Sequence, residues 1–91
     1  MTNFTWDSQK ELLNISKHNV DFNTAALAFD DPNRRIMYDS FHSQTEDRFF
    51  CFGKVANKIL TVRFTYRKNA IRIIGAGYWR RGKTAYEKKR T

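Results

Sequence analysis

The residues best suited to chemistry in this chain are arginines on one face of a predicted strand. From residue 58 to 67 the sequence alternates, so Arg63 and Arg67 share a polar face with threonines, while aliphatic and aromatic residues share the other. The planar fork of arginine binds two phosphate oxygens and keeps its charge. The pattern therefore favours a platform for a phosphate backbone, and the alternative is an ordinary half-exposed sheet whose arginines are merely solvated.

Further charged candidates lie on neighbouring predicted strands. Arg72 belongs to the return strand after a tight turn at 68–69, and Glu46 and Arg48 are two residues apart, which places them on one face of a strand. Glu46 and Arg48 could serve as a general base and a phosphate clamp. The favoured interpretation of Glu46 is instead an ion pair worth under about 1 kcal/mol, and Arg72 could equally be its partner.

Three side chains could move protons. His18 follows Lys17 at the end of a predicted helix, and histidine is a natural proton shuttle, although it also favours the last carbonyls of a helix. His42, in a polar loop, is a weaker candidate for catalysis. Tyr86 lies among basic residues, where it could stack on a base or donate a hydrogen bond, or simply pack its helix on the sheet.

Positive charge is concentrated in the last third of the chain. The formal net charge is +8, and from Arg63 onward ten lysines and arginines face a single acid, Glu87. This part includes Arg80, Arg81 and Lys83, which together with Lys17 and Arg48 are candidates to contact a polyanion such as RNA. Such a patch attracts polyanions; the candidates are nucleic acid, an acidic protein or an anionic membrane, and the absence of a long amphipathic anchor makes the membrane the least expected.

Length and composition predict one domain over residues 1–91. No apolar run approaches the roughly 20 residues of a membrane span, and the N-terminal residues lack the pattern of a secretion signal, so we expect a cytoplasmic protein. One cysteine, Cys51, excludes an internal disulfide, and with two scattered histidines it gives no zinc spacing. No metal or cofactor is therefore expected.

The predicted order of elements is that of an α+β protein: two N-terminal helices, an antiparallel sheet of about four strands and a short basic C-terminal helix. A capping box from Ser8 to Glu11 is predicted to begin the first helix, with Leu12 and Ile15 facing inward. The predicted boundaries are 8–17 and 23–29 for the helices, 35–39, 46–53, 58–67 and 70–77 for the strands, and a helical start near 83. Residues 4–6 form a short strand or an extended lead-in. Both tryptophans, Trp6 and Trp79, are predicted to belong to the core, with a base-stacking platform as the alternative.

Several motifs together resemble one known family, and they occur in order over nearly the whole chain. They are Phe4-x-Trp6-Asp7-x-x-Lys10, Asn14-x-x-Lys17-His18-x-Val20-x-Phe22, Ala26, Phe29-x-Asp31-Pro32, His42-Ser43-x-x-Glu46-x-Arg48, Gly53, Ile71-Arg72-Ile73-Ile74 and Tyr86. This combination resembles the BrnT family of bacterial toxins. The resemblance implies a RelE-like fold, RNA cleavage that arrests translation, and neutralisation by a BrnA-type antitoxin with a ribbon-helix-helix part, through which the pair represses its own operon.

The resemblance also implies cleavage without a metal. The 2′-hydroxyl attacks the adjacent phosphate, a base removes its proton, cations stabilise the phosphorane, and an acid protonates the leaving 5′-oxygen. The family usually continues the Arg-Ile-Ile strand with Ser-Ala-Arg, whereas this chain has Gly75-Ala76-Gly77. With Gly77 in place of arginine, either Arg80 or Arg81 takes over, or the toxin is weakened and serves only to bind its antitoxin and operator DNA. A basic nucleic-acid-binding domain unrelated to toxins is a third interpretation.

Overall fold

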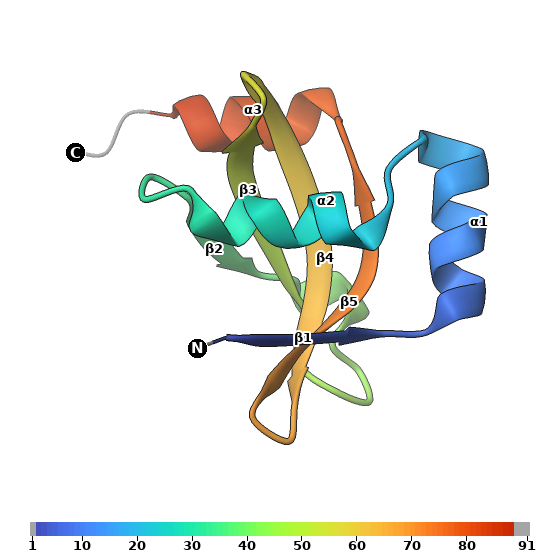
Figure 1. The fold of residues 1–91 in the computed structure, drawn as a ribbon. Coiled ribbons are helices and arrows are strands. Elements are labelled where there is room, and N and C mark those ends of the chain that lie inside the picture. Colours follow the sequence, from blue (N-terminus) through green and yellow to red (C-terminus); the bar gives the residue numbers. More distant parts are fainter. Residues whose placement is uncertain (1, 89–91) are drawn as a thin grey trace.

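The structure is a computed structural model that describes residues 2–88, which form three α-helices and one five-stranded sheet (Figure 1). The helices are α1 (Ser8–His18), α2 (Phe22–Leu27) and α3 (Arg80–Glu87), with short 3-10 turns at Ala28–Asp30 and Ser40–His42. The strands are β1 (Asn3–Trp6), β2 (Arg35–Tyr38), β3 (Phe49–Val55), β4 (Lys58–Arg67) and β5 (Ala70–Gly77). The predicted α+β class and the C-terminal helix are confirmed.

The sheet differs from the expected antiparallel sheet of four strands. Its order is β1-β5-β4-β3-β2, and β1 runs parallel to β5 while all other neighbours are antiparallel. The lead-in therefore becomes a fifth strand, with Phe4 opposite Ile71. Alternation within a short segment cannot reveal a partner so distant in the sequence, which is why the prediction missed this pairing.

Two tight turns join the three central strands. Ala56 and Asn57 connect β3 to β4, and Lys68 and Asn69 connect β4 to β5; all four have positive φ angles, between 49° and 67°. Two-residue turns with two left-handed positions match the twist of a hairpin, and asparagine tolerates that conformation. The predicted turn at 68–69 is confirmed, whereas β3 begins and ends later than the predicted 46–53.

The core lies between the sheet and α2, which crosses the front of the sheet in Figure 1. Leu60, Val62 and Phe64 of β4 are fully buried, as the alternation predicts, together with Phe22 of α2. Tyr66, at the end of the same row, is 57% exposed. The opposite face of β4 therefore presents Arg63 and the threonines away from α2.

The predicted inward face of α1 is wrong. Leu12 and Ile15 are 60% and 38% exposed, whereas Asn14 is buried. The Asn14 amide donates to the Ala76 carbonyl at 2.9 Å and its oxygen accepts from the Ala76 N–H at 3.1 Å. Strand β1 pairs only with residues 70–73 of β5, so the backbone N–H and carbonyl of Ala76 need another partner. The Asn14 side chain provides it, at a helix face where hydrophobic periodicity predicts aliphatic residues.

The capping of α1 also differs from the prediction. Asp7, rather than Ser8, caps the helix, because its carboxylate accepts from the N–H groups of Gln9 at 2.8 Å and Lys10 at 3.1 Å. Glu11 does not reach back to Ser8 but accepts from the N–H of Phe22 at 2.9 Å. The carboxylate therefore ties α1 to the start of α2.

Helix α3 lies against β4 and β3 on the face opposite α2, and begins at Arg80 rather than near 83. Gly82 makes this close approach possible, because a Cβ there would lie 1.8 Å from Thr61 Oγ1. At the other end of the helix, the Tyr86 hydroxyl donates to Asp31 at 2.6 Å. None of the helices within residues 2–88 is long and apolar enough to cross a membrane.

Candidate functional site

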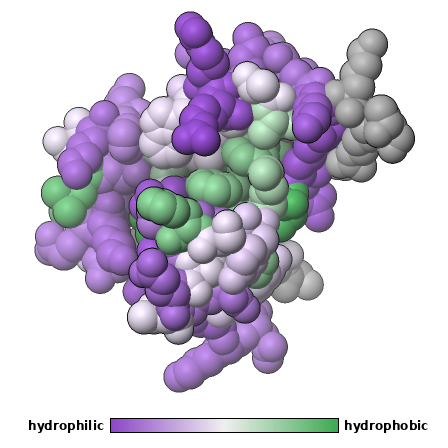
Figure 2. Space-filling model, turned by 180° about the vertical axis from the view of Figure 1, so that it is seen from behind, coloured by the Kyte–Doolittle hydropathy of each residue, from purple (hydrophilic) through white to green (hydrophobic). Residues whose placement is uncertain are grey.

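An open groove of about 1490 Å³ lies between α3 and the outer face of the sheet. Figure 2 views the molecule from the side opposite α2, where apolar surface gathers in the middle and hydrophilic surface surrounds it. Strands β2, β3 and β4 form the floor of the groove, and α3 forms one wall. The lining side chains most relevant to chemistry are those of Arg35, Asp39, Phe41, His42, Arg63, Trp79 and Arg81.

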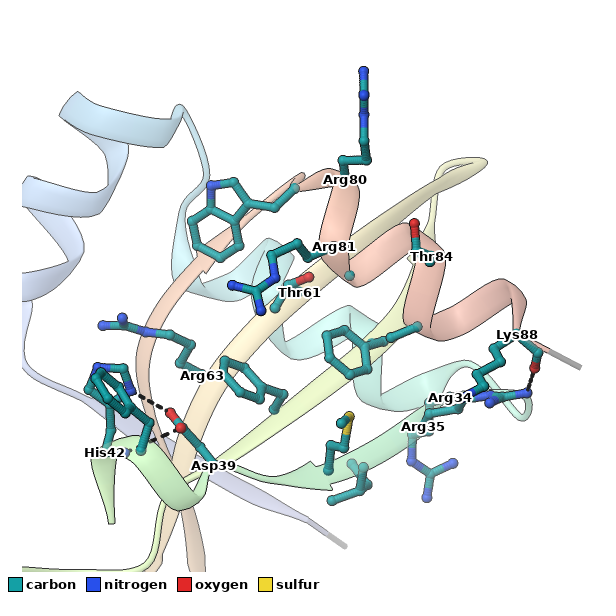
Figure 3. A pocket seen from close by; sticks show the side chains of 18 residues that line it. Arg34, Arg35, Asp39, His42, Thr61, Arg63, Arg80, Arg81, Thr84 and Lys88 are labelled. Atoms are coloured by element: carbon teal, nitrogen blue, oxygen red, sulfur yellow. Dashed lines mark hydrogen bonds and ion pairs between the residues drawn. The ribbon is translucent and has the colours of Figure 1, made fainter. Parts of the chain in front are cut away.

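Arginines from two elements reach this groove. Arg63 rises from β4 and extends over β5, where its Nε lies 3.4 Å from the position that a Cβ of Gly75 would occupy. Arg81, in the first turn of α3, extends toward the groove, whereas Arg80 points away from it (Figure 3). Arg81, rather than Arg80, is therefore placed to act together with Arg63.

A second basic group lies at the far end of the groove. Arg34 and Arg35 precede and begin β2, and Arg35 donates to the backbone carbonyl of Lys88 just after α3 (Figure 3). This contact links the end of α3 to the edge strand. The groove thus has cations at both ends, which suits an extended polyanion.

A carboxylate–histidine pair occupies the rim opposite α3. Asp39 is buried, with 6% of its surface exposed, and its Oδ2 lies 2.8 Å from Nδ1 of His42. The other oxygen of Asp39 accepts from the His42 N–H at 3.2 Å, so the carboxylate also caps the 3-10 turn that carries the histidine. The His42 side chain is 51% exposed. A carboxylate on one ring nitrogen orients the ring and leaves the other nitrogen available for proton exchange.

Aromatic side chains accompany these charges. Phe41 is 79% exposed, and its ring stands edge-on to that of His42 with centroids 5.0 Å apart. Trp79 lines the opposite side and is half-buried, while Phe50 and Phe52 stack on the floor at 5.8 Å. Exposed aromatic rings beside arginines are the combination that binds unpaired bases and their phosphates.

Three of the predicted site residues lie together outside the groove. Glu46 is held by Arg67 through hydrogen bonds of 3.0 to 3.2 Å, and by Arg48 at 3.3 Å. These hydrogen bonds lower the pKa of Glu46, first through Arg67, and raise the pKa of Arg67. The favoured ion pair of Glu46 is present, but its partners are Arg67 and Arg48 rather than Arg72.

The remaining predicted residues lie elsewhere on the surface. Lys17 and Lys83 are exposed, Arg72 is half-buried on β5, and none of the three lines the groove. His18 stands edge-on to the Trp79 ring at 5.1 Å. Tyr86 is engaged with Asp31, and this hydrogen bond raises the pKa of the tyrosine.

The structure therefore brings together Arg63 and Arg81 but leaves most other predicted site residues outside the groove. It adds Asp39 and Phe41, which sequence reasoning did not consider, and it gives His42 a better position than His18. The three-residue spacing of Asp39 and His42 is the one available signal, because an aspartate that caps a turn lies close to the residue three positions later.

Residues 2–88 offer little support for metal binding or for a cysteine nucleophile. No group of three or more histidine, cysteine, aspartate or glutamate side chains lies close enough together to hold a metal ion. Cys51 is buried, and the loss of solvent raises the pKa of its thiol to about 12, so it has little thiolate to act as a nucleophile.

The fold and the groove define a class: a small α+β protein with an open, basic, aromatic-lined groove that contains an aspartate–histidine pair. Residues 6–82 match the family model of the ribonuclease toxin BrnT of type II toxin–antitoxin systems, so the chain belongs to this family. The membership implies ribonuclease activity and a cognate antitoxin. A search of curated proteins found no match.

Proposed function

We propose that this chain is a metal-independent endoribonuclease that cleaves RNA in the cytoplasm and thereby arrests translation. In this proposal residues 1–91 form one RelE-like toxin domain. The observation that supports it most directly is the presence of the Asp39–His42 pair in the same groove as Arg63 and Arg81. Family membership supplies the ribonuclease class independently.

The proposed mechanism assigns one task to each group. His42, oriented by Asp39, removes the proton from the 2′-hydroxyl, which then attacks the adjacent phosphorus. Arg63 and Arg81 stabilise the negative charge that accumulates on the phosphate oxygens. The 5′-oxygen leaves and takes up a proton from water, and a 2′,3′-cyclic phosphate remains on the other fragment.

Arg67, Glu46 and Arg48 receive a different role. Because Glu46 holds Arg67 in a bidentate ion pair, this guanidinium is less available to a phosphate than that of Arg63. We assign the cluster to the positioning of the segment before β3, and we place Arg72, His18, Lys17, Lys83 and Tyr86 outside the reaction centre.

Neutralisation follows from the same groove. We propose that the cognate antitoxin is of the BrnA type, that it places carboxylates over Arg63 and Arg81, and that it carries the toxin to operator DNA through a ribbon-helix-helix part. An inhibitor blocks a phosphate-binding surface most directly when its carboxylates occupy the positions at which the phosphates would bind.

A second candidate function is favoured by Gly77, which stands where the family usually has arginine. In this alternative the chain has lost much of its catalysis and acts as an antitoxin-binding and operon-repressing module. The two candidates differ in whether RNA is cut, while both require the antitoxin.

The test is cleavage of an end-labelled RNA in the presence of EDTA by the wild-type protein, Arg63→Ala and Arg67→Ala. Both arginines lie on the same face of β4, so the second variant is a matched control for the loss of one charge. Removal of one transition-state donor costs about 10²- to 10³-fold in rate, and we expect this loss for Arg63→Ala but less than about tenfold for Arg67→Ala. Equal losses would contradict the assignment of Arg63, and the absence of cutting by the wild-type protein would favour the binding module.

A further inference from the structure

Two glycines on the outer face of β5 support two large side chains of the groove, those of Arg63 and Trp79. Gly75 lies opposite Arg63 and Gly77 lies opposite Thr61, so both face away from the core, while Ala76 between them is fully buried. The Arg63 guanidinium extends over Gly75. The indole of Trp79 covers Gly77 so closely that a Cβ at position 77 would lie 2.5 Å from its Cζ2.

These contacts hold the Trp79 side chain in one position. Its benzo ring lies on the backbone of β5, and the rings of Trp79 and His18 form a T-shaped pair with centroids 5.1 Å apart. Trp79 also lines the groove. Trp79 is thus half-buried and held on two sides rather than enclosed by the core, which differs from the prediction that it belongs to the core. A rigid aromatic ring that faces an open basic groove binds a planar ligand at little cost in side-chain entropy.

The spacing also fits a single nucleotide. Residues two apart on a strand are separated by about 7 Å, so the guanidinium over Gly75 and the indole over Gly77 lie side by side at that separation. A phosphate on Arg63 and the base of the same or the adjacent nucleotide on Trp79 match this geometry, because stacking on an aromatic ring accepts any base.

We infer that Trp79, which packs on Gly77, forms a nucleobase-binding subsite of the groove. In this subsite an unpaired base stacks on the indole beside the phosphate bound by Arg63. The inference rests on the proposed function for its substrate class, single-stranded RNA. It also explains the glycine at position 77. The side chain of an arginine there would occupy the space of the indole, so the position of Trp79 depends on Gly77.

The subsite can be tested without catalysis. The probe is a short single-stranded oligodeoxyribonucleotide, which lacks the 2′-hydroxyl and cannot be cut by the proposed mechanism. The protein carries Trp6→Phe, so that Trp79 is the sole tryptophan; Trp6 lies on β1 and packs against Phe22 at 6.0 Å, outside the groove. Stacking predicts quenching of the Trp79 emission on titration with the oligonucleotide.

Affinity measurements by fluorescence anisotropy of a labelled oligonucleotide complete the test. Stacking of one base is worth about 1 to 3 kcal/mol, which is roughly a 5- to 150-fold change in affinity. We expect this loss for Trp79→Ala and a much smaller one for Trp79→Phe, which keeps an aromatic ring and also reports whether the fold tolerates a change there.

The two glycines provide a matched pair of variants. Gly77→Ala forces the indole to move, whereas Gly75→Ala places its Cβ no closer than 3.4 Å to Arg63, an ordinary contact. We expect Gly77→Ala to shift the Trp79 emission and to reduce its quenching, and Gly75→Ala to leave both unchanged.

Unquenched Trp79 emission at saturating oligonucleotide, or wild-type affinity in Trp79→Ala, would overturn the inference. These outcomes are separate from the RNA-cleavage assay. Quenching in a protein that does not cut RNA would support the subsite and contradict the endoribonuclease. Cleavage by a protein whose Trp79 emission is not quenched would support the endoribonuclease and contradict the subsite.

Discussion

The two histidines of this chain differ in the side chains that contact their rings. His42 has the buried carboxylate of Asp39 at 2.8 Å from its Nδ1, whereas His18 packs edge-on against Trp79 at the end of α1. A general base must be oriented toward the proton that it abstracts, and only His42 has a partner of the kind that fixes a ring.

We therefore expect His42→Gln to lower the rate of RNA cleavage by about 10²- to 10⁴-fold, the usual contribution of a general base. His18→Gln is the comparison, with an expected loss of under about tenfold. Single-turnover rates at saturating protein separate this effect from weaker RNA binding. A loss confined to His18→Gln would transfer the base to α1 and contradict the present assignment.

Individual side chains were predictable where the backbone pattern alone decides their direction. Alternation along β4 placed Arg63 on the polar face, and that placement holds. The role of Asp39 could not be predicted from such a pattern, because it depends on the burial of this residue under a 3-10 turn. The inward face of α1 was mispredicted because hydrophobic periodicity ranks Leu12 and Ile15 above an amide, while the backbone groups of Ala76 bind the Asn14 amide.

Helix α3 forms one wall of the groove, and its position depends on the absence of a side chain at Gly82. Replacement of glycine by alanine in a helix usually stabilises it by about 1 kcal/mol. Here the added Cβ would lie 1.8 Å from Thr61 Oγ1. We expect Gly82→Ala to lower the free energy of unfolding by about 1 to 3 kcal/mol, the usual cost of overpacking.

Urea denaturation measures this loss, and a double-mutant cycle with Thr61→Ala tests its cause. Removal of the Thr61 hydroxyl relieves the closest contact and leaves Phe52 Cδ1 at 3.1 Å. The second substitution should therefore restore part of the stability. A cycle with no coupling between positions 61 and 82 would argue that α3 is held in another way.

The other end of α3 is anchored by Tyr86 and Asp31. Burial opposes ionisation of Asp31, but hydrogen bonds from Tyr86 and from the N–H groups of Lys54 and Asn33 outweigh it and keep its pKa below the ordinary 3.8. A lowered pKa means that the carboxylate stabilises the fold at neutral pH and that this stability is lost as the pH falls through the lowered value.

Tyr86→Phe should accordingly lower the free energy of unfolding by about 1 to 3 kcal/mol at neutral pH, and the difference from wild type should shrink once Asp31 is protonated, below pH 3.8. Tyr38→Phe is the matched control, because the Tyr38 hydroxyl donates to Asp47 at 3.1 Å on the exposed surface. Urea denaturation at neutral and acidic pH gives both values. A difference that does not change with pH would show that Asp31 is not the titrating partner.

Elements were predictable where one segment contains its own signal. The hairpin of β4 and β5 was predicted with its turn, and α1 was predicted within one residue of its end at His18. The start of α3 was placed too late because Gly82 was counted as a helix breaker, when it is the residue that lets the helix approach Thr61.

Over the whole molecule, charge and shape act together. Six lysines and arginines line the groove around its apolar middle: Arg34, Arg35, Arg63, Arg80, Arg81 and Lys88. Because the Arg80 side chain points away from the groove, five of them are placed to contact a strand that lies in it. Each phosphate neutralised by a cation contributes about −0.7 to the slope of log affinity against log salt for a single strand, so five contacts give roughly −3.5.

This slope is measurable with the same oligodeoxyribonucleotide over a salt series. We expect Arg81→Ala to reduce its magnitude by about 0.7, whereas Lys10→Ala, which removes an exposed charge on α1 far from the groove lining, should leave it unchanged. An equal reduction by both variants would indicate binding to the net charge of the protein rather than to the groove.

The pairing of β1 with β5 has a consequence for the order in which this protein can become active. In the sequence, two helices and three strands separate β1 from β5, yet β1 and β5 are neighbours in the sheet. The two hairpins form from local contacts, but the parallel pair closes only after every element between β1 and β5 has emerged from the ribosome. Gly75 and Gly77, which support Arg63 and Trp79, also arrive with β5. The groove of this ribonuclease-toxin family member is thus complete only after β5 has been synthesised and has paired with β1.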